Sequence, residues 1–421
     1  MVSLTAFVHG RDRLSRKRTL AAALLLLAAP LAAADWPQWR GPNRDGVVLD
    51  FKPPAAWPKE LNLVWKVAAG EGYSSPVIAE GRVILHEREG GDEIVRALDA
   101  ATGRVLWSDR LAAPFKKNPY ATEMASSPFS TPLAAGGRVF TLSGTNVLSA
   151  YDAARGKLLW RKDYSKHTGT AELFTGAAMS PIFEGGRVVA HVGDDRGGSV
   201  VALEPATGNL AWEWKGDGPG YASPVAVTLG GVRQLVTMTA KSVVSIESAT
   251  GRLLWKEPFP DEWNENIVTP VPYGDTIVVS GVRAGTKALR PVRKGAAWSV
   301  ETLWQNKTVN FYMSTPVLDG HVLYGLSARN KGQYVCLDAK TGKTLWATDG
   351  RSGNQAALVG AGAFVLVWTN QGELIVLTKN AARFEEAARY SLAQSSSYPH
   401  PAVSGNRIVV RDAASVAAYS F

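Results

Sequence analysis

The chain has 421 residues, of which 46% are hydrophobic and 20% charged, and its formal net charge is +9. This composition is that of a folded globular protein and excludes disordered and collagen-like chains. The basic residues form no cluster interleaved with aromatic side chains, so the charge does not indicate a nucleic-acid partner.

The first 34 residues have the pattern of a cleaved secretory signal peptide. Three basic residues at positions 16–18 precede an apolar run at residues 20–29, which is too short to cross a bilayer as a helix. Small residues at positions 32–34 form the expected cleavage site, so the mature chain is predicted to begin at Asp35 and to be periplasmic or secreted. The leader carries five basic residues and one acidic residue, and its removal leaves a net charge of +5.

From Ser75 onward the sequence repeats a unit that ends in tryptophan. In the first unit, Ser75-Pro76 is followed by Gly81-Arg82-Val83 and later by Asp99, Gly103 and Trp107. In five such units an acidic residue stands four positions before the glycine, and the tryptophan stands four positions after it. The tryptophans of these units are Trp107, Trp160, Trp212, Trp255 and Trp346.

Each unit has the features of a small antiparallel sheet. Valine-rich runs alternate with period two, as half-buried strands do, and a proline at a strand start loses no ladder hydrogen bond. The segment from the acidic residue to the glycine is a tight turn whose glycine supplies a positive φ. Consecutive tryptophans lie 42 to 53 residues apart, which is enough for four short strands. Such units are propeller blades, and we expect the tryptophans to be buried between neighbouring blades.

Three further units depart from the pattern. The unit that ends in Trp304 lacks the acidic turn, the unit that ends in Tyr390 lacks the proline, and residues 401–421 lack a fourth strand. Residues 63–67 supply that missing strand, with Trp65 as its docked tryptophan. The sequence therefore predicts an all-β fold: an eight-bladed β-propeller of four-stranded antiparallel blades, closed by pairing of its two ends.

The predicted organisation is a signal peptide at residues 1–34, an N-terminal latch at 35–62 and the propeller at 63–421. We expect the start of the latch to lie outside the ring, with Trp36 and Trp39 packed on a blade surface.

The repeated unit resembles the repeat of pyrroloquinoline-quinone (PQQ) propeller proteins. That superfamily includes quinoprotein alcohol dehydrogenases and the outer-membrane assembly factor BamB. The resemblance spans about residues 36–421, and the opening segment from Asp35 to Gly46 resembles the start of a bacterial subgroup named only for its PQQ-like repeats. The repeat is specific for the fold, whereas function depends on sites carried by the fold.

The dehydrogenase members imply a quinone held with a calcium or lanthanide ion, a catalytic aspartate and adjacent cysteines joined in a disulfide. This chain has a single cysteine, Cys336, which we expect to be a buried small hydrophobe. No continuous calcium loop is present, and Asp194-Asp195 is better explained as a polar turn. No nucleophile elbow, zinc motif or histidine pair at metal-ligand spacing occurs, so no catalytic residue and no metal site is predicted.

Two functions from different classes stay open. The first is an exported, non-catalytic binding or scaffolding propeller with a protein partner or a small ligand, without a transmembrane segment or lipid anchor. The alternative is a small quinoprotein-like oxidoreductase that binds PQQ with calcium. The missing cysteine pair favours the first, so no cofactor is assigned and PQQ with calcium belongs to the alternative.

The expected binding site is one mouth of the central channel. Innermost strands line the channel of a propeller, and here they follow the Ser/Thr-Pro pairs, so the residues before those pairs should surround the mouth. The candidate ligand-binding residues are Tyr73, Glu123, Tyr221, Asn266, Asn310, Tyr312, Arg351, Gln355 and His400; Ser126, Phe174, Asn264, Asn354 and Tyr398 belong to the same segments. The competing interpretation is that loops are polar in any case and that tyrosines pack there without a ligand.

Overall fold

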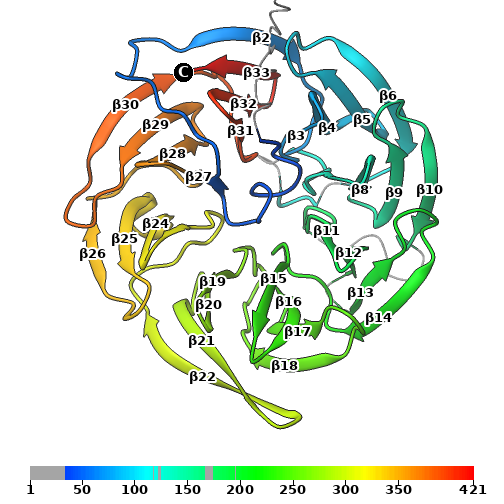
Figure 1. Ribbon diagram of the computed structural model, residues 1–421, viewed down its shortest axis with the longest axis vertical. Coiled ribbons are helices and arrows are strands. Elements are labelled where there is room, and N and C mark those ends of the chain that lie inside the picture. The colour runs from blue at the N-terminus through cyan, green and yellow to red at the C-terminus, as the bar shows by residue number, and fades with distance from the viewer. Residues whose placement is uncertain (1–33, 117, 122–124, 166–173, 195) are drawn as a thin grey trace, which may run out of the picture. The chain divides into compact units, whose positions relative to one another are not determined.

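The computed structural model describes residues 34–421 except 117, 122–124, 166–173 and 195, so residues 1–33 of the predicted signal peptide and Glu123 lie outside the described residues. The chain from residue 33 onward forms one compact unit. Its described residues form eight sheets arranged as the blades of a propeller (Figure 1), each with four antiparallel strands. This confirms the predicted fold class. Within the described part, no helix is long and apolar enough to cross a membrane.

Six blades consist of four consecutive strands, with the innermost strand first. The first three are β3 (Val77–Ala79), β4 (Arg82–Glu89), β5 (Asp92–Asp99) and β6 (Val105–Ala112); β7 (Leu133–Ala135), β8 (Arg138–Leu142), β9 (Val147–Asp152) and β10 (Leu158–Asp163); and β11 (Ile182–Glu184), β12 (Arg187–Gly193), β13 (Gly198–Leu203) and β14 (Leu210–Gly216). The next three are β15 (Val225–Leu229), β16 (Val232–Met238), β17 (Ser242–Glu247) and β18 (Leu253–Pro258); β19 (Val271–Tyr273), β20 (Thr276–Gly281), β21 (Gly285–Lys294) and β22 (Ala297–Asn306); and β23 (Val317–Asp319), β24 (Val322–Ser327), β25 (Gln333–Asp338) and β26 (Thr344–Ala347). A short 3-10 turn, Arg329–Lys331, joins β24 to β25.

The last two blades include strands from the N-terminal part of the chain. The seventh consists of β27 (Ala356–Ala361), β28 (Phe364–Thr369), β29 (Glu373–Thr378) and β30 (Glu386–Ser391), with β1 (Val47–Val48) added to β27. The eighth consists of β31 (Ala402–Ser404), β32 (Arg407–Arg411) and β33 (Ser415–Ser420), completed by β2 (Asn62–Ala68). The antiparallel pairing of β2 with β33 closes the ring, which confirms the predicted closure.

Most blade tryptophans hydrogen-bond to the following blade, whereas Trp255 Nε1 donates to Oε1 of Gln234 in its own blade at 3.0 Å. The indole Nε1 of Trp107 donates to the carbonyl of Ala153 at 3.0 Å, and equivalent bonds join Trp65, Trp160, Trp212, Trp304 and Trp346 to the next blade. Four of the five tryptophans expected to be buried are so; Trp346 is only partly covered.

The Ser/Thr side chains before each proline join neighbouring blades around the channel. The Thr131 main-chain N–H donates to Oγ of Ser180 at 3.0 Å, and the Ser180 N–H donates to Oγ of Ser223 at 2.9 Å. The same bond links Ser75 to Thr131 and Thr269 to Thr315. These hydroxyls therefore stabilise the contact between blades, a role that strand periodicity alone does not reveal.

The segment Trp36–Val48 lies inside the ring, which corrects the expectation that it lies outside. Trp36 and Ile78 of β3 exchange two main-chain hydrogen bonds of 2.8 and 2.9 Å, and β1 pairs in parallel with β27 in the seventh blade. In Figure 1 this dark blue segment crosses the central opening. The physical reason is that each innermost strand has one edge without a neighbouring strand, so its main-chain groups can bind another segment.

Two arginines fix this segment against opposite sides of the channel. The Arg40 guanidinium donates to the carbonyls of Thr315 and Pro316, and the Arg44 guanidinium donates to those of Ser180 and Pro181. Burial lowers the pKa of Arg40 to about 10 and that of Arg44 to about 9. Both side chains therefore have a structural role in the described chain, as hydrogen-bond donors to the inner strands.

Candidate ligand pocket at the channel mouth

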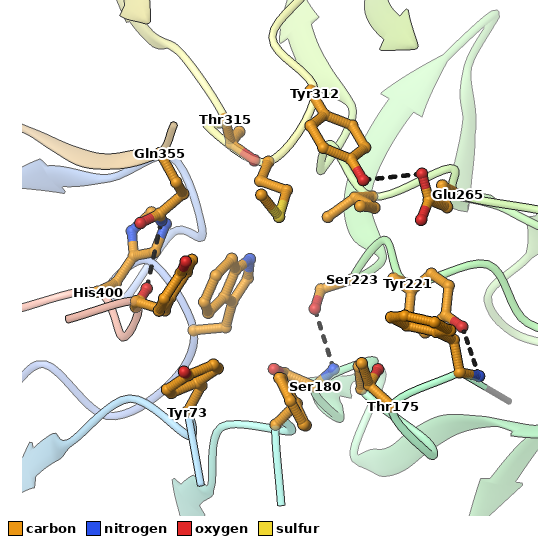
Figure 2. A pocket seen from close by; sticks show the side chains of 17 residues that line it. Tyr73, Thr175, Ser180, Tyr221, Ser223, Glu265, Tyr312, Thr315, Gln355 and His400 are labelled. Atoms are coloured by element: carbon orange, nitrogen blue, oxygen red, sulfur yellow. Dashed lines mark hydrogen bonds between the residues drawn. The ribbon is translucent and has the colours of Figure 1, made fainter. Parts of the chain in front are cut away.

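A pocket of about 210 Å³ lies at the mouth of the channel. Its walls come from loops that join the outermost strand of one blade to the innermost strand of the next, and the N-terminal segment adds Trp39 (Figure 2). The lining residues are Trp39, Tyr73, Phe129, Phe174, Thr175, Ala178, Ser180, Tyr221, Ser223, Glu265, Ile267, Tyr312, Met313, Thr315, Gln355, Tyr398 and His400. Seven of these carry Phe, Tyr or Trp rings, so the pocket offers mostly aromatic surface with a few polar groups.

Five of the nine candidate residues come together in this pocket: Tyr73, Tyr221, Tyr312, Gln355 and His400. The structure does not bring Asn266, Asn310 or Arg351 into the lining, and Glu123 is not among the described residues.

Asn266 lies behind the pocket and holds two of its loops. Its Nδ2 donates to the carbonyls of Thr239 and Phe259, each at 2.9 Å. Its own carbonyl accepts the main-chain N–H groups of Tyr221 and Ala222. Asn266 therefore positions the loops that carry Tyr221 and its own neighbour Glu265.

Asn310 also holds a loop behind the pocket, whereas Arg351 is exposed. The Asn310 Nδ2 donates to the Val282 carbonyl at 3.0 Å, while its Oδ1 accepts the N–H of Ala328 at 3.2 Å. These bonds fix the start of the loop that carries Tyr312. Arg351 lies in the connection between β26 and β27 and has a positive φ of 64°.

Trp39, Phe129 and Glu265 are pocket residues that the sequence analysis missed. The Trp39 indole donates to Oγ1 of Thr269 at 2.9 Å, and its ring lies 4.3 Å from that of His400, so it does not pack on a blade surface as expected. Glu265 lies between Asn264 and Asn266 in the segment before the Thr269-Pro270 pair, and this position is the sequence signal that could have identified it. No sequence signal placed Trp39, because its position depends on the path of the N-terminal segment.

The carboxylate of Glu265 lies at one end of the pocket. The Tyr312 hydroxyl donates to Oε2 of Glu265 at 2.8 Å, and the Phe174 N–H donates to the Tyr221 hydroxyl at 3.2 Å (Figure 2). Burial raises the pKa of Glu265, and the nearby Asp261 carboxylate adds to this effect although the Tyr312 bond opposes it. Burial and the Glu265 charge also raise the pKa of Tyr312 far above its ordinary value.

The opposite end is neutral and has unsatisfied polar atoms. Gln355 Nε2 donates to the Tyr398 carbonyl at 3.2 Å, whereas Gln355 Oε1 and His400 Nδ1 have no hydrogen-bond partner in the described chain. Burial lowers the pKa of His400 well below its ordinary value, and the Arg40 charge contributes. The rings of Tyr73 and Tyr398 stack at 4.5 Å on this side. Both unpartnered atoms are buried from solvent.

The donor groups of the pocket do not fit a calcium–quinone site. Among the described lining residues, Glu265 is the one carboxylate, and no cluster of three His, Cys, Asp or Glu residues in the described chain could hold a metal. Cys336 lies buried in β25, where burial raises its pKa to about 12. Asp194 accepts the N–H groups of Arg196 and Gly197, as the predicted polar turn requires.

A family profile described as outer membrane protein assembly factor BamB matches residues 60–127, 91–348 and 331–420. The chain belongs to this family. A BamB from Moranella endobia (strain PCIT) is 27% identical over 154 residues, which is 36% of each chain, so this match spans about a third of that relative. A BamB from Burkholderia pseudomallei (strain K96243) is 24% identical over 389 residues, or 84% of this chain and 94% of that protein.

Solved structures with the same fold include a BamB and an alcohol dehydrogenase. BamB from Moraxella catarrhalis has a TM-score of 0.58 at 15% identity, covering 86% of this chain and all of that one. Quinohemoprotein alcohol dehydrogenase from Comamonas testosteroni has a TM-score of 0.66 at 13% identity, covering 92% of this chain and 80% of that one. At these identities the likeness shows the fold alone.

Proposed function

We propose that this chain is a non-catalytic binding propeller that acts in the periplasm in outer-membrane protein assembly. The observation that carries the proposal is the family match across residues 60–420, supported by a BamB relative aligned over 94% of its own length. The single cysteine and the pocket's donor groups support a binding role over quinone chemistry.

The pocket face is the proposed docking surface for a protein partner. Tyr120 is 87% exposed and lies in the same loop as Phe129, while Trp263 is 72% exposed and lies in the same loop as Glu265. Exposed aromatic rings are favoured as anchors in protein interfaces. The partner would therefore contact these loops.

Site-specific photo-crosslinking in the bacterium that encodes the protein tests this function. A photoreactive residue replaces Trp263 on the pocket face or, as a control, the exposed Asn406 in the hairpin between β31 and β32. We expect position 263 alone to form adducts with a component of the outer-membrane assembly machinery, and a deletion strain to have less folded outer-membrane protein. Normal outer-membrane protein levels without adducts would contradict the proposal.

The second candidate function is a small PQQ-binding oxidoreductase, favoured by the fold shared with the Comamonas testosteroni enzyme and by the aromatic pocket. Purified protein mixed with PQQ and calcium is followed by absorbance and by dye-linked alcohol oxidation. The proposed scaffold predicts no turnover. Saturable PQQ binding with alcohol-dependent dye reduction would establish the enzyme instead.

A further inference from the structure

We propose that the Glu265 end of the pocket binds an organic cation, namely the guanidinium or ammonium group of a basic side chain on a polypeptide partner. The source of this cation rests on the proposed function, whereas the cation site itself rests on the geometry of the pocket.

The first argument is the combination of a carboxylate with aromatic rings. Tyr312 donates to Glu265 at 2.8 Å, and Tyr221 lies at the same end of the pocket (Figure 2). Phe174 also lines the pocket, and its main-chain N–H donates to the Tyr221 hydroxyl. Aromatic faces attract cations through their quadrupole, and a carboxylate accepts the N–H groups of guanidinium or ammonium. Apolar walls would shield such a pair from water and strengthen it.

The second argument is the charge around Glu265. No lysine or arginine lines the pocket in the described chain, and Glu265 forms no ion pair there. Arg283 pairs instead with Glu262, outside the lining. Asp261 adds a second negative charge at this end, whereas Arg40 influences the opposite end through His400. A bound cation would supply the missing counter-charge.

The third argument is that the site is already formed. The Glu265 N–H donates to Oδ1 of Asp261 at 3.0 Å, and the adjacent Asn266 ties this loop to the carbonyls of Thr239 and Phe259. A rigid site loses little conformational entropy when a ligand binds.

The probe is a fluorescently labelled pentapeptide, Gly-Ala-Arg-Ala-Gly, followed by anisotropy. Its control contains citrulline, which has the shape of arginine without the charge. We expect the arginine peptide to bind at least about tenfold more tightly than the citrulline peptide, because the buried pair needs the charge. Equal affinity, or no binding of the arginine peptide, overturns the proposal.

Protein variants locate the site. Glu265→Gln keeps the shape and removes the charge, and it should abolish the preference for arginine; Glu262→Gln removes a neighbouring carboxylate outside the lining and should preserve it. Thermal unfolding of both variants controls for folding. Loss of the preference in Glu262→Gln alone would place the cation elsewhere and overturn the proposal.

A third ligand distinguishes a basic side chain on a polypeptide from a small free cation. Nα-acetyl-arginine amide should bind at least about tenfold more weakly than the pentapeptide, because it lacks the flanking main-chain groups. Equal affinity would overturn the polypeptide source and leave a site for small cations. Absence of crosslinks at position 263 with the arginine preference intact would instead contradict the assembly function alone.

Discussion

The indole of Trp160 packs against Gly208, the turn glycine of the next blade, and donates from Nε1 to the carbonyl of Pro205 at 2.9 Å. A β-carbon on Gly208 would lie 2.7 Å from the indole ring. The same contact joins Trp65 to Gly103, Trp107 to Gly156, Trp212 to Gly251 and Trp304 to Gly342. The repeat therefore needs this glycine for space between blades as well as for its positive φ.

Replacing Trp160 by alanine should lower the free energy of unfolding by about 3–5 kcal/mol, because it removes a buried aromatic side chain and leaves a cavity. Denaturant unfolding measures the change. Leu159→Ala is the control, since that neighbouring side chain is 41% exposed, and it should cost less than about 1 kcal/mol. Equal losses in the two variants would contradict docking by Trp160.

Two glycine substitutions separate two effects on stability: the steric clash of a β-carbon with the indole and the strain of a positive φ. Gly186 and Gly208 have φ of +76° and +68°, but a β-carbon on Gly186 would meet nothing within 4 Å. Gly208→Ala should therefore destabilise the protein more than Gly186→Ala, because both carry the φ strain and only one meets an indole. In the double variant with Trp160→Ala, the loss should be smaller than the sum of the single losses. Strict additivity would show that the contact contributes nothing.

Two truncations test the separate roles of the N-terminal segment. Removing residues 35–48 deletes β1 and the arginine contacts but leaves β2, so the ring should stay closed, monomeric and less stable. Removing residues 35–67 also deletes most of β2, which exposes the edge of β33, and should cause aggregation. Size-exclusion chromatography with thermal unfolding distinguishes the products. Aggregation of the shorter truncation would show that ring closure also needs the inserted segment.

The repeat predicted the propeller because its residues are fixed by local geometry. A proline at a strand start, an acidic turn with glycine and a tryptophan at constant spacing each reflect a contact that recurs in blade after blade. The acidic turn is not required for burial of the indole, since the blade after Trp255 also lacks it and Trp255 is still buried.

The pocket could be predicted only in part, because some of its residues do not follow the repeat. The rule that residues before each Ser/Thr-Pro pair surround the mouth placed Tyr221 and Tyr312, because that relationship repeats with the blades. It could not tell the side chains that face the pocket from Asn266, which points behind it to main-chain carbonyls. Trp39 enters the pocket through a single, non-repeated insertion, which no internal periodicity can reveal.

Acidification should destabilise the fold from about pH 6.5 downward. Burial lowers the pKa of His191 to about 4 and that of His400 well below its ordinary value of 6.5. In the unfolded chain these histidines bind protons below pH 6.5, while in the folded chain they stay neutral to a lower pH. The unfolded state then binds more protons, so stability falls as pH falls. At pH 5 one such histidine should cost about 2 kcal/mol.

Glu93 extends the same trend to lower pH. Burial alone would raise the pKa of Glu93, but the hydrogen bond and charge of His86, with the charge of Arg88, outweigh it and hold this pKa below its ordinary 4.5. Glu93 therefore stabilises the fold at pH values above the pKa that it has in the unfolded chain. This stabilisation is lost as the pH falls through the lower pKa that it has in the folded chain.

Thermal unfolding between pH 7.5 and 5 measures the histidine contribution. His191→Gln can keep a hydrogen bond to the Asp217 carbonyl, which His191 Nε2 contacts at 3.1 Å, and it removes one titrating group. Its Tm should therefore depend less on pH than that of the parent protein, even if the Tm at pH 7.5 is lower. His321→Gln, at an exposed position, is the matched control and should keep the parent slope. An unchanged slope in His191→Gln would show that His191 is not a source of the acid sensitivity, because removing a group that protonates only on unfolding must reduce the proton uptake.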